Sequence, residues 1–345
     1  MSKLPKWAIV GLAFPLVCLN SWLLYRLGGL LQPITSIVIT ASLVAFLLDY
    51  PIGLLEKQGA KRRVAIAAVL LTTTTVTTVL VIFLGPLVWQ QLNDFAERLP
   101  RWIELAKTQL LLLEDRAMFQ NLPVDLDQLT VEAANQLSSA LQTGTSQVIN
   151  VTLSTLDKTL NLLITAVLAI LLVFNGEALW NGLLSWFSEP WQNHIRSALR
   201  PSFRGYFSGQ ATLALILATA QSIAFVLLNV PFGLLFGLGI GLASIIPFGG
   251  TVAVLGVSTL LTFQSMGLGL KVLAVAAVLG QINDNLIAPR LIGGITGLNP
   301  AVVVMALLIG AKFAGFLGLL LAVPTASFVK KIADIARTAP QPASE

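Results

Sequence analysis

The stretch that decides the fold runs from Gln281 to Val329 and reads QINDNLIAPRLIGGITGLNPAVVVMALLIGAKFAGFLGLLLAVPTASFV. Its first residues place the carboxylate of Asp284 among the amides of Gln281, Asn283 and Asn285, at the end of an apolar run. A charged group near hydrocarbon is costly unless it pairs or faces water, so it indicates a functional site. The Gly-rich, interrupted apolar segment that follows is typical of transporters, which expose polar backbone to a solute.

The composition indicates a protein that crosses a membrane several times. Of the 345 residues, 56% are apolar and only 11% are charged, whereas about 25% of the residues of a soluble domain are charged. One cysteine and one histidine exclude a disulfide framework and a histidine-based metal site or proton relay. No G-x-x-x-x-G-K-[ST] phosphate loop occurs, so we expect no nucleotide hydrolysis.

Apolar runs predict about six full transmembrane helices and two pairs of shorter segments. A helix needs about 20 residues to cross the hydrocarbon core. The arms of each pair are shorter than that and meet at a turn, so we expect re-entrant helical hairpins that enter and leave by the same face. The spans are expected over 7–25, 34–48, 64–89, 160–174, 207–228 and 272–288, and the hairpin arms over 232–246 with 251–263 and 301–311 with 316–329.

This pattern predicts an all-α polytopic membrane protein in five parts. Residues 1–90 hold the N-terminal transmembrane helices, 91–159 an external amphipathic helical insert, and 160–206 a transmembrane helix with a Trp-rich cytoplasmic interfacial helix. Residues 207–332 form an inverted-repeat transport core with two hairpins, and 333–345 a polar tail. Pro300 follows Pro231 by 69 residues, as Gly310 follows Gly241. The hairpin tips of such a repeat are expected to meet near the midplane and to form the solute site.

The external insert carries an apolar stripe at helical spacing. Leu92, Phe95, Leu99 and Trp102 share one helix face, so the third span is expected to continue as an amphipathic helix outside the bilayer. A second helix is expected after Asp125. The stripe buries itself either in an intramolecular hairpin or against a neighbouring subunit, and the second alternative makes a homo-oligomer an expectation.

Basic residues orient the chain. Short loops that are rich in Lys and Arg stay in the cytoplasm. The expected cytoplasmic segments are therefore both termini and the loops that contain Lys61, Arg62 and Arg63, and Arg196, Arg200 and Arg204. The insert then lies outside.

The candidate site combines the polar cluster with the hairpin tips. Asp284 is the candidate for cation or proton coupling, and the amides of Gln281, Asn283 and Asn285 would contact an uncharged polyol or sodium. Arg290 either pairs with Asp284 or anchors at the cytoplasmic interface. Lys312 either binds an anionic group or snorkels to that interface. Exposed backbone donors and carbonyls are expected at Pro247, Gly249, Gly250 and Gly310.

Several of these residues also resemble a known family. The motifs are Ile246-Pro247-Phe248-Gly249-Gly250, Asp284-Asn285-x-Ile287-x-Pro289-Arg290-Leu291-x-Gly293, Gly297-Leu298-x-Pro300 and Gly315-x-x-Gly318-x-x-x-Ala322-Val323-Pro324. Together they resemble the autoinducer-2 exporter family of bacterial membrane permeases. The resemblance implies a multi-pass inner-membrane permease without its own ATPase, which exports a small polar signal or exchanges sodium for protons. Gly294 and Asn299 depart from the basic residue and the histidine that the family often has there, which weakens any transfer of substrate identity.

Other classes of function fit the sequence less well. An intramembrane hydrolase needs a nucleophile with a partner base, and Asp284 has no second acid nearby in sequence. A passive pore lined by Gly-rich hairpins remains an alternative. We therefore expect a transporter rather than an enzyme, with the lipid bilayer and a small polar solute as partners. Sodium or a proton is the expected coupling ion, and we expect no other cofactor and no nucleic acid.

Overall fold

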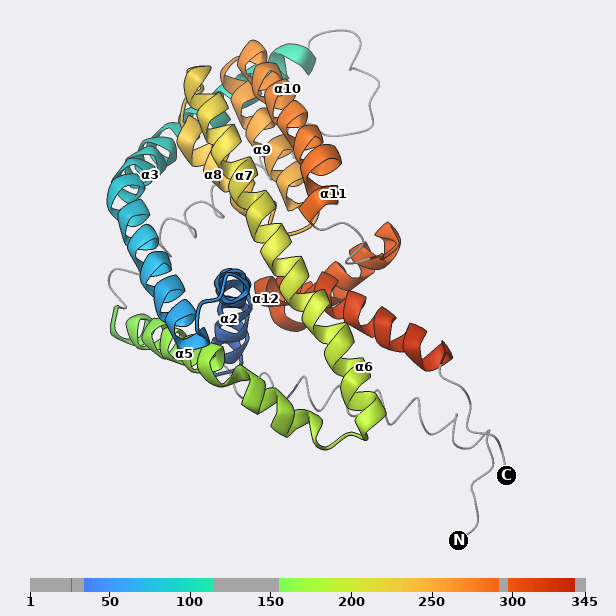
Figure 1. Ribbon diagram of the computed structural model, residues 1–345. Helices are drawn as coiled ribbons and strands as arrows, with labels where there is room; N and C mark the ends of the chain where they lie inside the picture. Colours follow the sequence, from blue (N-terminus) through green and yellow to red (C-terminus); the bar gives the residue numbers. More distant parts are fainter. Residues whose placement is uncertain (1–25, 27–33, 115–154, 292–296, 339–345) are drawn as a thin grey trace.

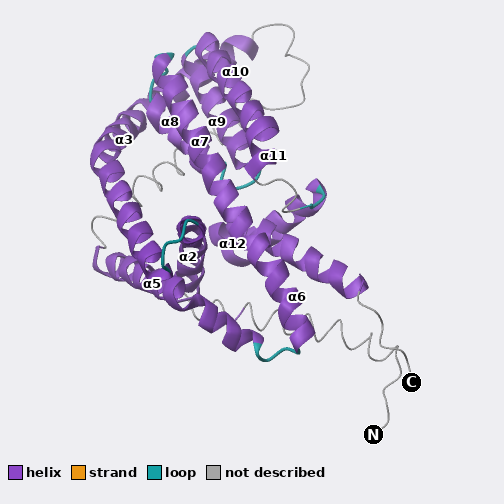
Figure 2. Cartoon of the chain, in the orientation of Figure 1, coloured by secondary structure: helices purple, strands orange, loops and turns teal. Residues whose placement is uncertain are grey.

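The structure is a computed structural model that describes residues 26, 34–114, 155–291 and 297–338. Every regular element within these ranges is a helix (Figure 2). The first expected span, the second helix of the insert and the last residues of the tail lie outside the described residues.

Two helix groups are joined by two long helices (Figure 1). In one group, α2 (Ile34–Lys57) packs against α5 (Thr155–Leu184). The other group contains α8 (Gly233–Ala243), α9 (Gly249–Gln264) and α10 (Met266–Ile282), which continues as the π-helical turn η2 (Asn283–Ile287) and α11 (Ala288–Leu291). The connecting helices are α3 (Arg62–Glu114) and the run of α6 (Glu189–Arg200), the π-helical turn η1 (Pro201–Gly205) and α7 (Tyr206–Leu227). The final helix, α12 (Pro300–Thr338), packs mainly on α6 and η1.

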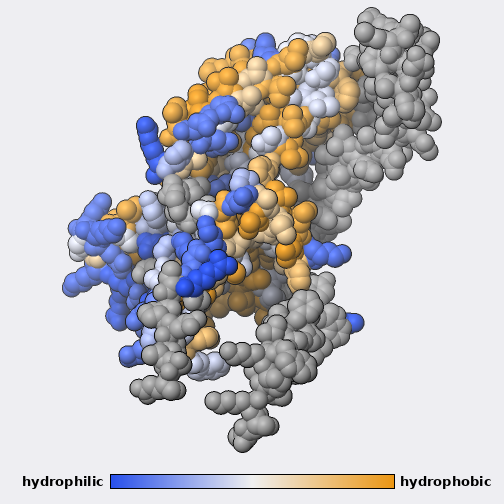
Figure 3. Space-filling view, turned by 90° about the vertical axis from the view of Figure 1, so that its right-hand side faces the viewer, coloured by the Kyte–Doolittle hydropathy of each residue, from blue (hydrophilic) through white to orange (hydrophobic). Residues whose placement is uncertain are grey.

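Six of the described segments are long and apolar enough to cross a membrane. They are Ile34–Lys57, Arg62–Trp102, Thr159–Leu184, Glu189–Leu227, Met266–Leu291 and Pro300–Ile335. Large apolar side chains on them are exposed, as at Leu71 (73%), Phe83 (70%) and Leu162 (71%), and Figure 3 shows apolar residues over much of the upper part of one face. A surface of this kind is stable only in lipid. The predicted all-α polytopic membrane protein is confirmed.

Both pairs of short segments fold back on themselves. The first pair is α8 and α9, of 11 and 16 residues, which pack against each other. The second pair is the two halves of α12, which change direction at Ala314 (φ −138°) and Gly315 (φ 55°). The backbones of Gly310 and Gly318 touch across this bend, where no side chain would fit. We call these pairs hairpin 1 and hairpin 2.

The small-residue stripe of hairpin 1 packs where the sequence predicts close helix contact. Gly237 lies against the backbone of Ser222, and Gly241 lies against Ala218, both on α7. A Cβ atom at either glycine would overlap α7, so the interface depends on the missing side chains.

The insert stripe is buried, but on a partner that the sequence did not suggest. Phe95, Leu99 and Trp102 are at most 5% exposed and form one apolar cluster with Phe232 and Phe236 of hairpin 1. The side-chain oxygen of Gln91 also accepts a hydrogen bond of 3.0 Å from the backbone N–H of Leu235. Within the described residues, the stripe is therefore covered by hairpin 1.

Two expected boundaries differ in the structure. Trp180 and Leu184 belong to the last turns of α5, so the Trp-rich segment begins within that helix. Pro190 lies in the first turn of α6, which ends at Arg200, and η1 begins at Pro201. A proline lacks the backbone N–H and clashes with the preceding turn of an α-helix, and the π-helical turn η1 accommodates it. At the C-terminus α12 continues to Thr338, into the segment expected to be a tail.

Candidate functional site

The predicted polar cluster lies in a π-helical turn, not at the end of a helix. The apolar helix α10 continues through η2 and α11 to Leu291, and Asn283, Asp284 and Asn285 occupy η2. The side-chain N–H of Asn283 donates to the Asp284 carboxylate at 3.3 Å, and that of Asn285 donates to the Gln281 oxygen at 2.6 Å. Single π-helical turns inside α-helices occur frequently at functional sites.

The cluster has one buried face and one open face. Asn283 is 5% exposed, and its Oδ1 atom has no hydrogen-bond partner among the described residues. Asp284 and Asn285 are exposed. No ion pair joins Asp284 to Arg290, although the structure describes both residues, so the expected alternative in which they pair is not observed. The carboxylate is therefore open to a cation, a proton or a solute.

Hairpin 1 and η2 both contact α7. Phe248 adopts a left-handed backbone conformation (φ 65°) in the turn that also contains Pro247, and Gly249 begins α9 against the Ala243 carbonyl. A left-handed bulky residue is unusual and indicates a constrained turn. The Gln210 side chain of α7 donates to the Ser244 carbonyl at 2.5 Å, which holds this turn on α7. Because η2 also packs on α7, one helix supports both parts of the predicted site.

Hairpin 2 packs on a different part of the long helix. Its apolar residues Leu317 and Val323 join Leu43 of α2 and Tyr206 and Phe207 at the start of α7. Gly310 lies in the contact between the two arms, and Lys312 is exposed next to the bend. The principal contacts of α12 are with α6, η1 and α2. The sequence predicted that the tips of the two hairpins meet. In the structure, hairpin 1 is not among the principal contacts of hairpin 2.

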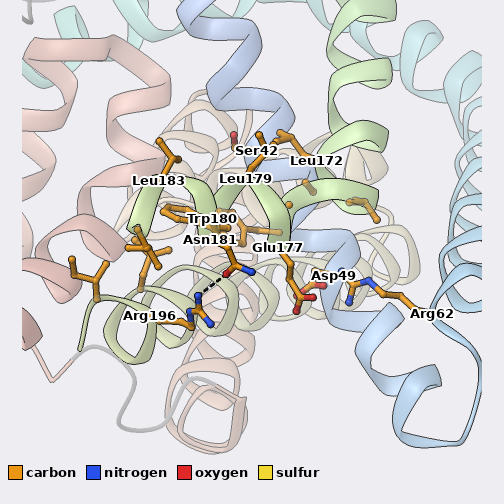
Figure 4. A pocket seen from close by; sticks show the side chains of 17 residues that line it. Ser42, Asp49, Arg62, Leu172, Glu177, Leu179, Trp180, Asn181, Leu183 and Arg196 are labelled. Carbon is orange, nitrogen blue, oxygen red and sulfur yellow. Dashed lines mark hydrogen bonds between the residues drawn. The ribbon is translucent and has the colours of Figure 1, made fainter. Parts of the chain in front are cut away.

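A second polar region was missed by the sequence analysis. A pocket of about 520 Å³, here called the α5 pocket, lies between α2, α5 and α6 (Figure 4). Its polar side chains include Asp49, Arg62, Glu177 and Asn181, and the oxygen of Asn181 accepts a hydrogen bond of 2.6 Å from Arg196. The expected second span stopped one residue before Asp49, because a charged residue normally ends a membrane run.

A larger pocket of about 860 Å³, here called the η1 pocket, lies beside the first and shares Arg196 with it. It is bounded by the end of α2, by η1 and the start of α7, and by Leu291 of α11. Arg204 on its wall forms an ion pair of 3.1 Å with Asp49 of α2. We call this end of the molecule, which carries Lys57, Arg62, Arg196 and Arg204, the basic end.

The arrangement favours binding over bond chemistry. The described residues contain no group of three or more His, Cys, Asp or Glu side chains that could hold a metal ion. The groups gathered at η2 are one carboxylate and three amides, which bind hydroxyl groups and hard cations. The site thus has ligands for a solute or an ion in an apolar helix.

Comparison with known proteins agrees with this conclusion. Residues 12–338 match the family described as AI-2E family transporter. A protein of Synechocystis sp., provisionally named transport protein sll0063, is 38% identical over 96% of this chain and 85% of its own length. A second Synechocystis protein, provisionally named transport protein sll0060, is 34% identical over 94% and 95%. Permease PerM of Escherichia coli, also a provisional name, is 23% identical over 90% and 88%. The chain belongs to the AI-2E transporter family.

Proposed function

We propose that this protein is a secondary active transporter that exports a small polar solute, of the autoinducer-2 type, across the bacterial inner membrane. In this proposal Asp284 couples the movement of the solute to a sodium or proton gradient. The observation that carries the proposal is η2, a π-helical turn that interrupts an apolar helix. It places an open carboxylate beside a buried amide oxygen that has no hydrogen-bond partner among the described residues.

The unpaired oxygen supports a binding role. A buried acceptor without a partner costs about 1–3 kcal/mol, so a protein that retains one has a reason to do so. A hydroxyl group of a solute or a bound sodium ion would satisfy Asn283 Oδ1 while contacting the carboxylate of Asp284. Carboxylate and amide oxygens are the ligands that hard cations prefer.

The position of the carboxylate supports coupling. Asp284 lies in the membrane-crossing segment Met266–Leu291, where an ionisable residue is expensive and marks an ion or substrate pathway. Binding of a cation or a proton neutralises the carboxylate, which lowers the cost of moving η2 relative to the lipid. Hairpin 1 and η2 both rest on α7, so a shift at one can reach the other through one helix.

The test is transport in proteoliposomes with imposed sodium, proton and solute gradients. Asp284→Asn keeps the shape and hydrogen bonding of the side chain but removes its charge, so gradient-driven transport should be abolished while insertion and stability persist. The matched control is Glu97→Gln, which removes a charge from an exposed residue of α3, a helix that is not among the principal contacts of η2. It should transport like the wild type.

The other functions give different results in the same experiment. Proton movement driven by sodium alone, with no solute, would identify a sodium/proton antiporter. Solute flux that follows only its own gradient would identify a passive pore. Equal coupled rates for wild type and Asp284→Asn at matched protein levels would refute the assignment of Asp284.

A further inference from the structure

The η1 pocket leads from the basic end of the molecule toward the helix that carries η2. Its outer wall includes Lys57 and Arg196, and its inner wall includes Ser208 and Thr212 of α7 and Leu291 at the end of α11. Leu291 and Asp284 lie on one continuous helix. The hydroxyls of Ser208 and Thr212 donate to the backbone carbonyls of Gly205 and Ser208. Their oxygens can still accept hydrogen bonds from water or a solute in the pocket.

Arg204 joins the two sides of this pocket. Its Nη1 atom lies 3.1 Å from the Asp49 carboxylate, and its Nη2 atom donates to the backbone carbonyls of Asp49 at 2.7 Å and Tyr50 at 3.5 Å. These contacts connect η1 to the last turns of α2, although the residues are 155 positions apart. A side chain at Gly53 would overlap the guanidinium, so a glycine is required for Arg204 to lie there.

The contact is strong enough to hold and exposed enough to open. The Arg204 and Asp49 side chains are 22% and 26% exposed, so water can solvate the two charges when the ion pair separates. Ion pairs in such positions contribute little net free energy, whereas hydrogen bonds from a charged donor to backbone carbonyls contribute more. Arg204 also lies in a π-helical turn, and such single turns inside α-helices occur frequently at functional sites.

The pocket carries an excess of positive charge. Glu56 is the acid on its wall, and it pairs with Arg62 at 3.4 Å, while Arg204 pairs with Asp49. Lys57 and Arg196 add two further positive charges to the wall. A concave site with an excess of one sign of charge raises the local concentration of oppositely charged solutes.

We infer that the η1 pocket is the cytoplasmic entrance of the transport path, that it admits small anionic solutes, and that the contact of Arg204 with Asp49 and Tyr50 is its gate. The inference rests on the proposed function and narrows its solute class. In the closed state the gate holds α2 against η1. When the gate opens, the wall formed by α2 moves away from η1 and the path to η2 widens.

The first experiment measures access to the pocket without transport. A cysteine is introduced at Thr212 in a Cys18→Ala protein, and its rate of reaction with a membrane-impermeant methanethiosulfonate is measured from each side. We expect reaction from the basic end only. Gly53→Ala displaces the guanidinium without changing any charge and should raise the rate about tenfold, the effect of losing one hydrogen bond to a charged group. Asp49→Asn should act in the same direction, as an independent disruption of the gate.

A control cysteine and two sets of charge-removing variants complete the test. Gln58→Cys lies at the basic end, is exposed and does not line the pocket, so its rate should not respond to Gly53→Ala. The anionic sulfonatoethyl reagent should react at position 212 faster, relative to its rate with free thiol, than the cationic trimethylammonium reagent. Lys57→Gln with Arg196→Gln should remove that preference, whereas Lys271→Gln on α10, which does not line the pocket, should leave it unchanged.

Failure of this inference can be told from failure of the proposed function, because access does not require coupling. Asp284→Asn should leave every rate at position 212 unchanged even where it abolishes transport. Reaction at position 212 from the opposite side only, or no reaction from either side, would overturn the entrance. Rates unaffected by both Gly53→Ala and Asp49→Asn would overturn the gate, and a preference for the cationic reagent would overturn the solute class.

Discussion

Replacing Gly237 by alanine should loosen the contact between hairpin 1 and α7. A Cβ atom at position 237 would lie 2.5 Å from the Cα and Oγ atoms of Ser222, whereas non-bonded carbon atoms settle at about 3.5–4.0 Å. The backbone of α7 cannot yield as a flexible side chain would, so α8 must move outward by about 1 Å. Overpacking of this kind costs about 1–3 kcal/mol.

Gly239→Ala is the matched control for this change. It alters the same residue type in the same helix, but nothing lies within 4 Å of a Cβ atom at that position. Alanine in place of a helix-interior glycine stabilises by about 0.5–1 kcal/mol. Both variants receive this gain, so their difference isolates the steric cost at the α7 contact.

Thermal unfolding of the two purified variants in the same detergent, followed by tryptophan fluorescence, measures the difference. We expect Gly239→Ala to unfold at or above the wild-type temperature and Gly237→Ala to unfold below it, with free energies about 1–3 kcal/mol apart. The same displacement should reduce solute transport in Gly237→Ala, because the turn at Phe248 moves with α8. Equal stability of the two variants would refute the tight contact of α8 with α7.

Three further predictions concern the packing and the orientation of the chain. Trp102→Ala removes a ring that lies 5.9 Å from the Phe232 ring and should cost about 3 kcal/mol of stability. An unchanged unfolding temperature would contradict the apolar contact between α3 and hairpin 1. Gln221 is fully buried, and both polar atoms of its side chain lack a partner among the described residues. Gln221→Leu should therefore preserve or raise stability by about 1 kcal/mol, and a large loss in a denaturation curve would show that the amide is satisfied. Cysteines at Gln58 and Met266 should react with an impermeant reagent from opposite sides, and labelling from one side would contradict the orientation derived from the basic residues.

The features that the sequence predicted well have strong local signals. The turn signal at Pro247–Gly250 predicted hairpin 1, and the interruption at Lys312–Gly315 between two short apolar arms predicted hairpin 2. The helical spacing of Phe95, Leu99 and Trp102 predicted the long extension of α3. Such patterns depend on residues a few positions apart, which chain geometry alone brings onto one face. The sequence could not predict that hairpin 1 covers the stripe, because a periodicity shows that a helix face is buried but not which element buries it.

The features that escaped prediction depend on distant segments or on a change of helical pitch. Nothing local to Asp49 or Arg204 indicates that they meet across 155 residues. Three consecutive polar residues begin η2, and such a run is typical of the end of an apolar helix, so Asp284 was interpreted as a residue at a helix end rather than within a helix. The predicted site residues were thus found by their chemistry, while their placement required the structure.

The π-helical turn at Pro201–Gly205 also sets the rotation of α6 relative to α7. Its hydrogen bonds skip one residue more than those of an α-helix, so the turn holds one extra residue. If the same residues formed a regular α-helix instead, α6 would rotate about the axis of α7 by about 100°, the turn of one residue. Arg196 would turn away from Asn181, and α5 and α2 would lose their register with α7. A relative of this protein that is one residue shorter here could therefore assemble the basic end on an uninterrupted helix, whereas this chain needs the π-helical turn.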